Sequence, residues 1–440
     1  MPTRRQLLAG LALGGTACFS GLPGLVRAAE DSDRYFIFCY FNGGWDLLLS
    51  LDPRDPDEFR DDLKKSTRIE LGYSGLSSSY RENVETSVEG MVFGPAIGDL
   101  ADHAERLCVV RGMSMDTLTH EVGRRRFITG QQPAGLQAQG SSIATVLASQ
   151  LGSSHAIPQL SVRVESYNDG FPGFSTAIRV NGVEDLLRAL RPSPLALSEG
   201  EAAAVERLMG QAEDCPDISG SRLRAAAMEY RAASKDLVEL GLDDLFDFTT
   251  SEASDLRDLY GISVYELDAA PAQAATAVTA ITSGISRCVS IEACASLDTH
   301  GPEWTSHPGS LKKGFDVVAA MLTDLAWRDY GDGTSWLDHT TVVCFSEFGR
   351  TPLLNSSGGR DHYLHNACVL AGGGVAGGRI IGASSDVGMA PLPTDLVSGQ
   401  ASDAGEIVKP EHIFRALLHG VGVTEDVAEL DAQPLLALYE

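Results

Sequence analysis

The sequence predicts an α/β fold in which a mostly parallel sheet is sandwiched between helices. Short runs of consecutive apolar residues recur along the chain, as is typical of strands that are buried on both faces. Segments with apolar residues at helical spacing separate several of these runs, and short loops rich in glycine and asparagine follow some of them. Strands that alternate with helices need crossover connections, so most of the strands should be parallel.

Residues 1–29 are interpreted as a twin-arginine signal peptide rather than as part of the fold. Arg4 and Arg5 precede a weakly apolar stretch at 8–26, and small residues at 28 and 29 provide a cleavage point. The alternative is a disordered tail that carries two arginines by chance. The stretch is too short and too rich in glycine for a stable membrane span. We therefore expect the twin-arginine export machinery to be a partner, a periplasmic or secreted location, and no stable membrane insertion after cleavage.

The predicted core begins with a strand at 35–41, which ends at the turn Asn42-Gly-Gly-Trp-Asp46. The other core elements, in chain order, are a strand at 107–111, helices at 121–129 and 141–151, a strand at 290–296, a helix at 310–326, strands at 340–345 and 367–371, and a helix at 411–418. Within 30–440, residues 158–285 are interpreted as an insertion or cap. A hairpin is expected at about 158–182, followed by acidic helices from 198 to about 260.

Charge and cysteine content exclude some functions. The net charge is −26, and it becomes −29 when the three arginines of residues 1–29 are removed. This balance disfavours binding to nucleic acid or to anionic lipid. Seven cysteines lie outside the signal peptide, and an odd number argues against a complete disulfide framework. Whether Cys288 and Cys294 form a disulfide is left open.

Six acidic and imidazole side chains follow apolar strands and form a candidate metal set. They are Asp46, Asp298, His300, Glu347, Asp361 and His362. Because the carboxyl ends of parallel strands meet at one edge of a sheet, these side chains should lie close together. Oxygen and nitrogen ligands suit a divalent metal, and the set is compatible with Zn²⁺, Mn²⁺, Mg²⁺ or Ca²⁺.

Each of these residues also has a structural interpretation. Asp46 could stabilise a turn or cap a helix, and the Asp298–His300 segment could form a loop hydrogen bond. Glu347 could form an ion pair with Arg350. The neighbours Asp361 and His362 could be a buried hydrogen-bonded pair.

The segment 116–126 contributes a second group of candidate residues at the start of a helix. Thr119 is a candidate nucleophile or additional ligand, and His120 a candidate ligand or acid–base group. Arg124, together with Arg350, could hold an anionic ester. In the alternative interpretation Thr119 is simply the N-cap of an exposed helix.

Five motifs, in this order behind the twin-arginine segment, resemble one exported family. They are NGGWD at 42–46, LDTHG at 297–301, SEFGRTP at 346–352, GGRDHY at 358–363 and LAGGGVAGGRIIG at 370–382. The family is catalogued as domain of unknown function 1501, and it looks like a branch of the alkaline phosphatase and sulfatase superfamily. The resemblance implies an alkaline-phosphatase-like sheet with one or two metals at its C-terminal edge, beside a serine, threonine or formylglycine nucleophile.

Carried over by position, the resemblance makes Asp46 an early metal ligand and places Thr119 near the nucleophile. It makes Asp298 and His300 ligands of one metal, and Glu347 and His362, with Asp361, later metal-site positions. The chain has no Cys-x-Pro-x-Arg signature, which argues against formylglycine chemistry. It has SEFGR where an Asp-His pair would complete a second metal site.

The function expected from these features is a periplasmic metal-dependent hydrolase of phosphate or related (sulfate or phosphonate) esters. Its substrate would be a small anionic ester. The alternative is an exported, non-catalytic metal-binding or assembly protein that retains the alkaline-phosphatase-like fold. Position 119 separates the two hypotheses, because catalysis requires Thr119 close to the metal carboxylates.

Overall fold

The computed structural model describes residues 32–191, 198, 200, 201, 203, 204, 207 and 241–439. The predicted signal peptide at 1–29 and most of the predicted acidic helices between 198 and 240 lie outside these residues.

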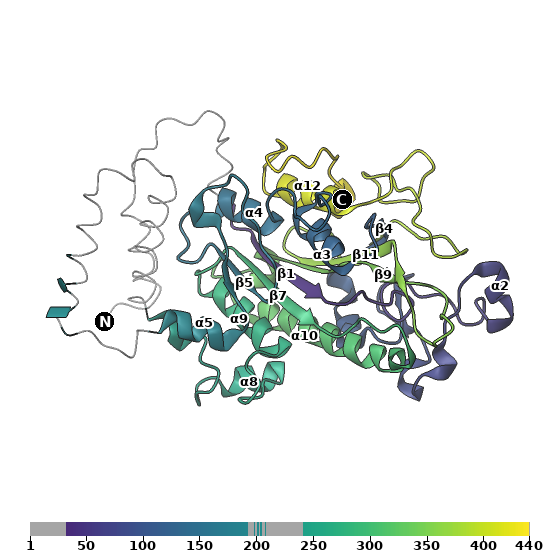
Figure 1. Ribbon diagram of the computed structural model, residues 1–440, viewed down its shortest axis with the longest axis horizontal. Coiled ribbons are helices and arrows are strands. Elements are labelled where there is room, and N and C mark those ends of the chain that lie inside the picture. The colour runs from purple at the N-terminus through teal and green to yellow at the C-terminus, as the bar shows by residue number, and fades with distance from the viewer. Residues whose placement is uncertain are drawn as a thin grey trace.

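An eight-stranded sheet forms the centre of the molecule (Figure 1). The strands follow the order β12-β4-β11-β8-β1-β7-β5-β6. Their bounds are β1 Tyr35–Phe41, β4 Leu107–Ser114, β5 Gln159–Val162, β6 Ile178–Val180, β7 Cys288–Cys294, β8 Thr340–Ser346, β11 His365–Gly372 and β12 Arg379–Ile381. Only β11 runs antiparallel to its neighbours β4 and β8. The predicted α/β class with a mostly parallel sheet is therefore confirmed.

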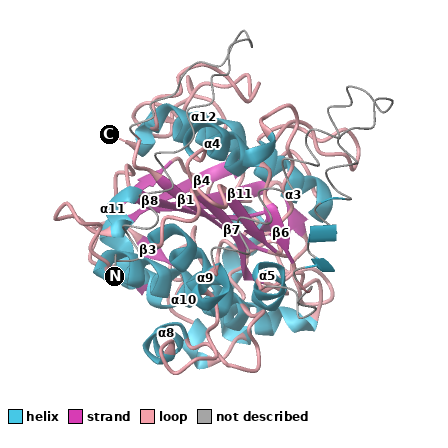
Figure 2. Cartoon of the chain, turned by 90° about the vertical axis from the view of Figure 1, so that its left-hand side faces the viewer, coloured by secondary structure: helices cyan, strands magenta, loops and turns pink. Residues whose placement is uncertain are grey.

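Helices cover both faces of this sheet (Figure 2). The helices on one face are α8 Ser254–Tyr260, α9 Ala270–Thr282 and α10 His307–Trp327, and those on the other are α3 His120–Thr129, α4 Ile143–Leu151 and α12 Pro410–Gly420. Strand β1 serves both cores, because Ile37 and Cys39 belong to the first and Phe36 and Phe38 to the second. Successive strand residues point to opposite faces, and both faces of β1 are buried, so every position in the strand is apolar.

The described part of the chain also contains shorter α-helices and two small sheets. The helices are α2 Lys64–Thr67, α5 Val183–Leu190 and α11 Trp336–His339. Two small sheets pair β2 Val84–Glu85 with β3 Val92–Phe93, and β9 Gly349–Arg350 with β10 His362–Tyr363. The β9–β10 pair lies just after β8 in the chain and carries two of the predicted site residues.

The hairpin predicted at about 158–182 is wrong. Strands β5 and β6 pair in parallel, with Leu160 opposite Ile178, and β5 also pairs in parallel with β7. Part of the predicted insertion at 158–285 therefore extends the central sheet. Alternating apolar and polar residues correctly indicated two strands, but this period does not report the direction in which neighbouring strands pair.

All six cysteines of the described residues are buried and free. Cys288 and Cys294 lie at the two ends of β7, so they do not form the disulfide that the sequence left open. Among the described helices, none combines the length and the apolar character that crossing a membrane requires.

Candidate metal centre

Four side chains converge at one point beyond the C-terminal ends of the parallel strands. His120, Asp298, His300 and His362 each offer one ligand atom, and these atoms lie within 4.8 Å of one another. The Oδ1 atom of Asp298 is 2.9 Å from His300 Nε2, 3.3 Å from His120 Nε2 and 3.5 Å from His362 Nε2. Ligands at the usual Zn–N distance in a tetrahedral site are separated by about 3.3 Å. The spacing therefore fits a single ion.

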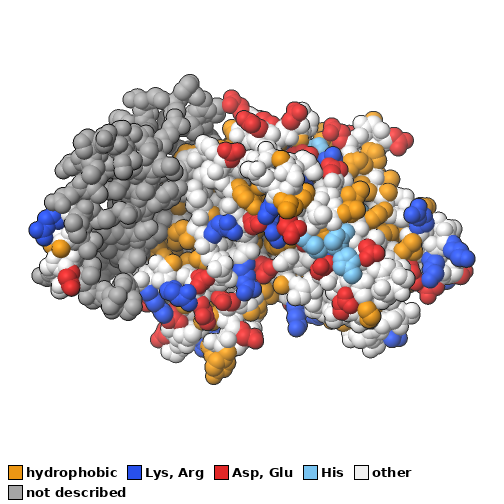
Figure 3. Space-filling view, viewed as in Figure 1, with side chains coloured by type: hydrophobic (Ala, Val, Ile, Leu, Met, Phe, Trp, Pro, Cys, Tyr) orange, Lys and Arg blue, Asp and Glu red, His pale blue; other side chains and the backbone are white. Residues whose placement is uncertain are grey.

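Four separate segments bring these residues together. Asp298 and His300 lie in the loop after β7, His120 begins α3, and His362 begins β10. Glu347 directly follows β8. Strands β7 and β8 both run parallel to β1, so their following loops reach the same edge of the sheet. Figure 3 shows histidine side chains gathered at the surface, with acidic side chains beside them.

Each histidine is oriented through its Nδ1 atom. The partners are Glu347 Oε1 for His120 at 2.8 Å, Asp361 Oδ1 for His300 at 2.8 Å and the Leu118 carbonyl for His362 at 2.6 Å. A carboxylate or carbonyl oxygen only accepts, so each Nδ1 donates and each Nε2 carries the lone pair. Metal-binding histidines are usually held by such partners.

The short distances between the Nε2 atoms favour a cation among them. The Nε2 atoms of His300 and His362 are 2.9 Å apart, and two facing lone pairs at this distance repel unless a proton or a metal lies between them. His120 Nε2 is buried and has no hydrogen-bond partner. Buried polar atoms normally have a partner, so a cation at this position would satisfy His120 Nε2 and relieve the repulsion between His300 and His362.

Asp298 brings a negative charge to the centre, beside the positive charge of Arg350. Partial burial acts to raise the pKa of Asp298, but the hydrogen bond from Arg350 and the charge of His120 outweigh it and lower this pKa to about 2. Asp298 is therefore ionised at neutral pH. The hydrogen bond to Glu347 raises the pKa of His120, whereas burial lowers the pKa of His362.

Glu347 and Asp361 lie behind the histidines and not among the four converging groups. Glu347 is fully buried and accepts hydrogen bonds from the Gly43 amide at 2.8 Å and from the Ser346 hydroxyl at 2.9 Å, in addition to His120. Asp361 is half exposed and also accepts a hydrogen bond from Asn355 at 2.9 Å. The structure therefore gives these two carboxylates an orienting position.

Asp46 lies outside the four-residue group. Its Oδ2 atom accepts a hydrogen bond from Trp304 at 2.9 Å and pairs with Arg360 at 2.8 Å. Its Oδ1 atom accepts a hydrogen bond from the Leu48 amide at 3.1 Å. These contacts match the turn-stabilising interpretation of Asp46, because both oxygens have partners within the protein.

The remaining candidates occupy different positions. Arg124 is bound through two nitrogens to Glu165, each at 3.1 Å, so its guanidinium group is already paired. Arg350 pairs with Asp298 at 2.8 Å and not with Glu347. Thr119 is exposed and immediately precedes His120 as the N-cap of α3, but its side chain makes no capping hydrogen bond.

Two glycines allow the segments of the centre to approach. A Cβ atom at Gly123 of α3 would lie 2.5 Å from the carbonyl oxygen of Glu347, so only glycine lets α3 bring His120 to this carboxylate. A Cβ atom at Gly359 would lie 2.3 Å from the backbone of His300. These close approaches explain two glycines near the predicted site residues.

Sequence reasoning missed several supporting groups. The Leu118 carbonyl and Asn355 carry no recognisable signal, because any residue offers a carbonyl and asparagine is common in loops. The buried Phe348 ring packs against the rings of His120 and His362, with centroids 4.9 and 4.3 Å away. Its position directly after Glu347 was the only signal that could have indicated it.

His307 fixes the loop that carries Asp298 and His300. It is fully buried, its Nε2 accepts a hydrogen bond from the Asp46 amide at 3.1 Å, and its Nδ1 is 2.8 Å from the Thr299 hydroxyl. Protonation of Nε2 would break the bond to Asp46. Burial lowers the pKa of His307 to about 4.

Acid should therefore weaken the fold through His307. Its folded-state pKa lies below its unfolded value of about 6.5, so its contribution is complete above this pH and is lost as the pH falls towards 4. The expected loss in the free energy of unfolding is about 3 kcal/mol. Denaturant unfolding between pH 7 and pH 4 should show a smaller pH dependence for His307→Gln than for the wild type, and equal slopes would contradict this assignment.

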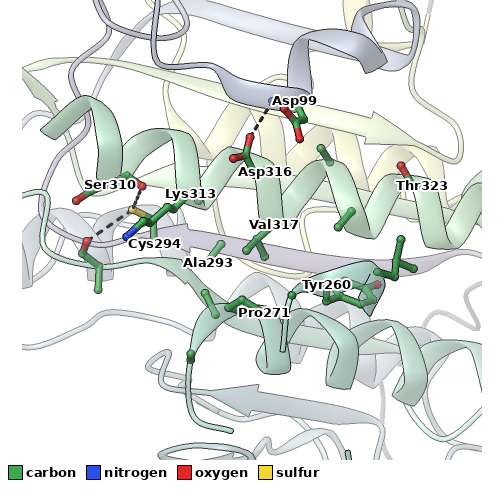
Figure 4. Close-up of a pocket in the computed structure, with 18 of the residues that line it drawn as sticks. Asp99, Tyr260, Pro271, Ala293, Cys294, Ser310, Lys313, Asp316, Val317 and Thr323 are labelled. Atoms are coloured by element: carbon green, nitrogen blue, oxygen red, sulfur yellow. Dashed lines mark hydrogen bonds between the residues drawn. The ribbon is translucent and has the colours of Figure 1, made fainter. Parts of the chain in front are cut away.

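A cavity of about 1030 Å³ lies along α10 (Figure 4). Its described lining residues include Ala293, Lys313 and Val317, but none of the four converging residues. Asp99 and Asp316 also line it, and the Asp99 amide donates a hydrogen bond to Asp316 Oδ1 at 2.8 Å (Figure 4).

Comparison with known proteins gives one strong match. The model of the family described as "Protein of unknown function (DUF1501)" matches residues 33–398. No curated protein matches. Among solved structures, the chain is similar to Ps i-CgsB, alone (TM-score 0.40, 10% identity) and in complex with k-i-k-neocarrahexaose (TM-score 0.38, 9% identity). Each alignment covers 92% of this chain and 75% of the other, and at these TM-scores it supports no functional inference. The match over 33–398 shows that the chain belongs to the DUF1501 family.

Proposed function

We propose that this chain is a periplasmic metal-dependent hydrolase of phosphate or related esters, with one divalent ion held by His120, Asp298, His300 and His362. The observation that carries the proposal is the convergence of three imidazole Nε2 atoms and one carboxylate oxygen, with every Nδ1 atom engaged by an acceptor. A divalent ion bound there would polarise an ester and lower the pKa of a nearby hydroxyl or water.

The ligand set narrows the choice of metal. Three imidazoles and one carboxylate favour Zn²⁺ or Mn²⁺, whereas Mg²⁺ and Ca²⁺ prefer sites built mainly from oxygen atoms. Only one such group occurs among the described residues. We therefore propose one metal, in agreement with the SEFGR motif in place of an Asp-His pair.

Two features support a catalytic rather than a purely structural role. The side chains of Asp298 and His300 are 50% and 42% exposed, so a water or an ester oxygen can reach the centre. Thr119 is exposed and adjoins ligand His120 in the chain, and its hydroxyl is bonded only to the Thr117 hydroxyl at 3.3 Å, so we propose it as the nucleophile. Export and kinship with the alkaline phosphatase and sulfatase superfamily remain part of the proposal and rest on the sequence motifs.

The side chains around the centre suggest how an ester is held. Arg350 supplies a positive field beside Asp298, but its fully buried guanidinium already donates to acceptors within the protein, so it does not contact the ester itself. Leu118 and Leu364, each two residues from a ligand, are 47% and 42% exposed. A small anionic ester with an apolar group fits this combination of charge and exposed leucine.

A non-catalytic metal-binding or assembly protein is the second candidate. Four protein ligands complete a tetrahedral Zn²⁺ site, which is the usual arrangement of a structural zinc. Arg124, the other predicted anion-binding residue, is already paired with Glu165. Both observations favour a site that binds metal without turnover.

Ester hydrolysis by metal-loaded protein separates the two candidates. Phosphate, sulfate and phosphonate esters should be tested with Zn²⁺-loaded and Mn²⁺-loaded protein. If Thr119 is the nucleophile, Thr119→Val should lower kcat by a factor of about 10²–10⁴ with unchanged metal content, whereas Thr119→Ser should retain most activity.

Thr305→Val is a matched control, because it removes another exposed hydroxyl that follows His300 in the chain. Equal activity of Thr119→Val and the wild type would assign the attack to water instead. Absence of hydrolysis of every ester by protein with a full complement of metal would favour the binding protein.

A further inference from the structure

Arg350 lies directly against two of the four proposed ligands. Its Nη2 atom is 2.8 Å from Asp298 Oδ1, and its Nη1 atom is 3.2 Å from His300 Nε2. The Arg350 side chain is fully buried. A permanently charged group therefore contacts the same atoms that would bind the metal.

Backbone carbonyls hold this guanidinium in place. Its Nε donates to the Gly44 carbonyl at 3.0 Å, Nη1 donates to the Arg360 carbonyl at 3.1 Å, and Nη2 donates to the Gly43 carbonyl. The guanidinium is planar and does not lose its proton in proteins. Arg350 thus remains next to the centre whether or not a metal is bound.

Arg350 and a metal compete for one lone pair. The Nδ1 atom of His300 donates to Asp361, which leaves a single acceptor position at Nε2. That position accepts the hydrogen bond from Arg350 Nη1 or binds a metal, but not both. Asp298 is different, because a carboxylate oxygen can accept from Arg350 and ligate a metal at the same time.

We infer that Arg350 is a placeholder cation for the metal-free centre. It orients Asp298 and His300 before the ion arrives, and it gives up its bond to His300 when the ion binds. The inference rests on the proposed metal site but not on hydrolysis. Arg350 therefore stabilises the metal-free protein and lowers its apparent affinity for the metal, because only molecules with a free His300 Nε2 can bind the ion fully.

Metal titration of Arg350→Gln tests this inference. Calorimetric titration with Zn²⁺ and with Mn²⁺ should show affinity about tenfold to a hundredfold higher than in the wild type, as expected for removal of one charge-assisted hydrogen bond. The Tm of the metal-free variant should fall, and the rise in Tm on adding Zn²⁺ should be larger than in the wild type. Arg350→Lys keeps the positive charge but lacks the planar guanidinium with its several donors, so its metal affinity should rise less than that of Arg350→Gln.

Arg287→Gln is the matched control. Arg287 is also buried and donates to backbone carbonyls, those of Leu151 and Arg34. It directly precedes β7 and lies beside the N-terminal end of β1, at the opposite end of these strands from the centre. This variant should lose stability without any change in metal affinity.

The outcomes are decisive for Arg350. Equal or weaker metal binding by Arg350→Gln would overturn the placeholder role and make Arg350 a support for the loaded site. If Arg350→Gln folds only with Zn²⁺ present, the metal replaces the missing cation and the inference is supported. Failure to fold with or without Zn²⁺, while Arg287→Gln folds, would overturn it. Absence of metal binding by both the wild type and Arg350→Gln would instead refute the metal site itself.

Discussion

His362→Ala should lose its bound metal almost completely. His362 supplies one of the four converging atoms, and the loss of a direct ligand should lower affinity by more than the roughly 10–100-fold cost of losing an outer-shell partner. Elemental analysis after gel filtration and titration with Zn²⁺ would measure stoichiometry and affinity. His300→Ala should behave in the same way.

His419→Ala provides the control for this experiment. His419 is exposed near the end of α12, and its removal should leave the metal content unchanged. Wild-type stoichiometry in both His362→Ala and His300→Ala would show that the ion, if any, binds elsewhere.

Glu347 should matter both for metal affinity and for folding. Glu347→Gln keeps the size of the side chain but removes the charge that holds His120 Nδ1, so we expect metal affinity to fall about 10–100-fold. Glu347→Ala would leave the Gly43 amide and His120 Nδ1 without an acceptor, whereas the Ser346 hydroxyl would keep the Phe41 carbonyl at 2.6 Å. The expected loss in the free energy of unfolding is about 3 kcal/mol or more.

Asp361→Asn is a graded comparison for Glu347→Gln. Both carboxylates orient a histidine, but the Asp361 side chain is 53% exposed and that of Glu347 is fully buried. Water can replace the Asp361 carboxylate as the partner of His300. Asp361→Asn should therefore lower metal affinity by only about tenfold and leave the free energy of unfolding unchanged. If Asp361→Asn proved the more damaging of the two, burial would not be what gives Glu347 its importance. Metal titration and denaturant unfolding would measure both quantities.

Several elements of the site were predictable from local sequence. The positions of Asp298, His300 and His362 after apolar runs placed them at one sheet edge, and the structure brings them within ligand distance of one another. This worked because strand direction follows from the alternation of strands and helices, and parallel strands present their ends together. Three of the four converging side chains were therefore predictable before any coordinates.

Other elements depended on contacts that the sequence does not encode locally. The sequence did not decide whether His120 is a metal ligand or an acid–base group. In the structure, α3 brings His120 to the centre only because Gly123 lets the helix approach Glu347. The sequence placed Asp46 in the candidate metal set, but in the structure its Oδ2 atom pairs with Arg360 and accepts a hydrogen bond from Trp304. Strand pairing was similarly hidden, since β5 and β6 lie parallel and not in a hairpin.

By itself, the amino-acid order determined the class of fold, the buried strands and the kinds of side chain available at the sheet edge. These follow from hydrophobic periodicity and from the chemistry of each residue, which act over short stretches of chain. The tertiary structure alone decided which side chains converge on the candidate metal centre, which ones orient them from behind and which ones have partners elsewhere. Such roles depend on angles and distances of an ångström or so between loops far apart in the chain, and only the packed core sets these.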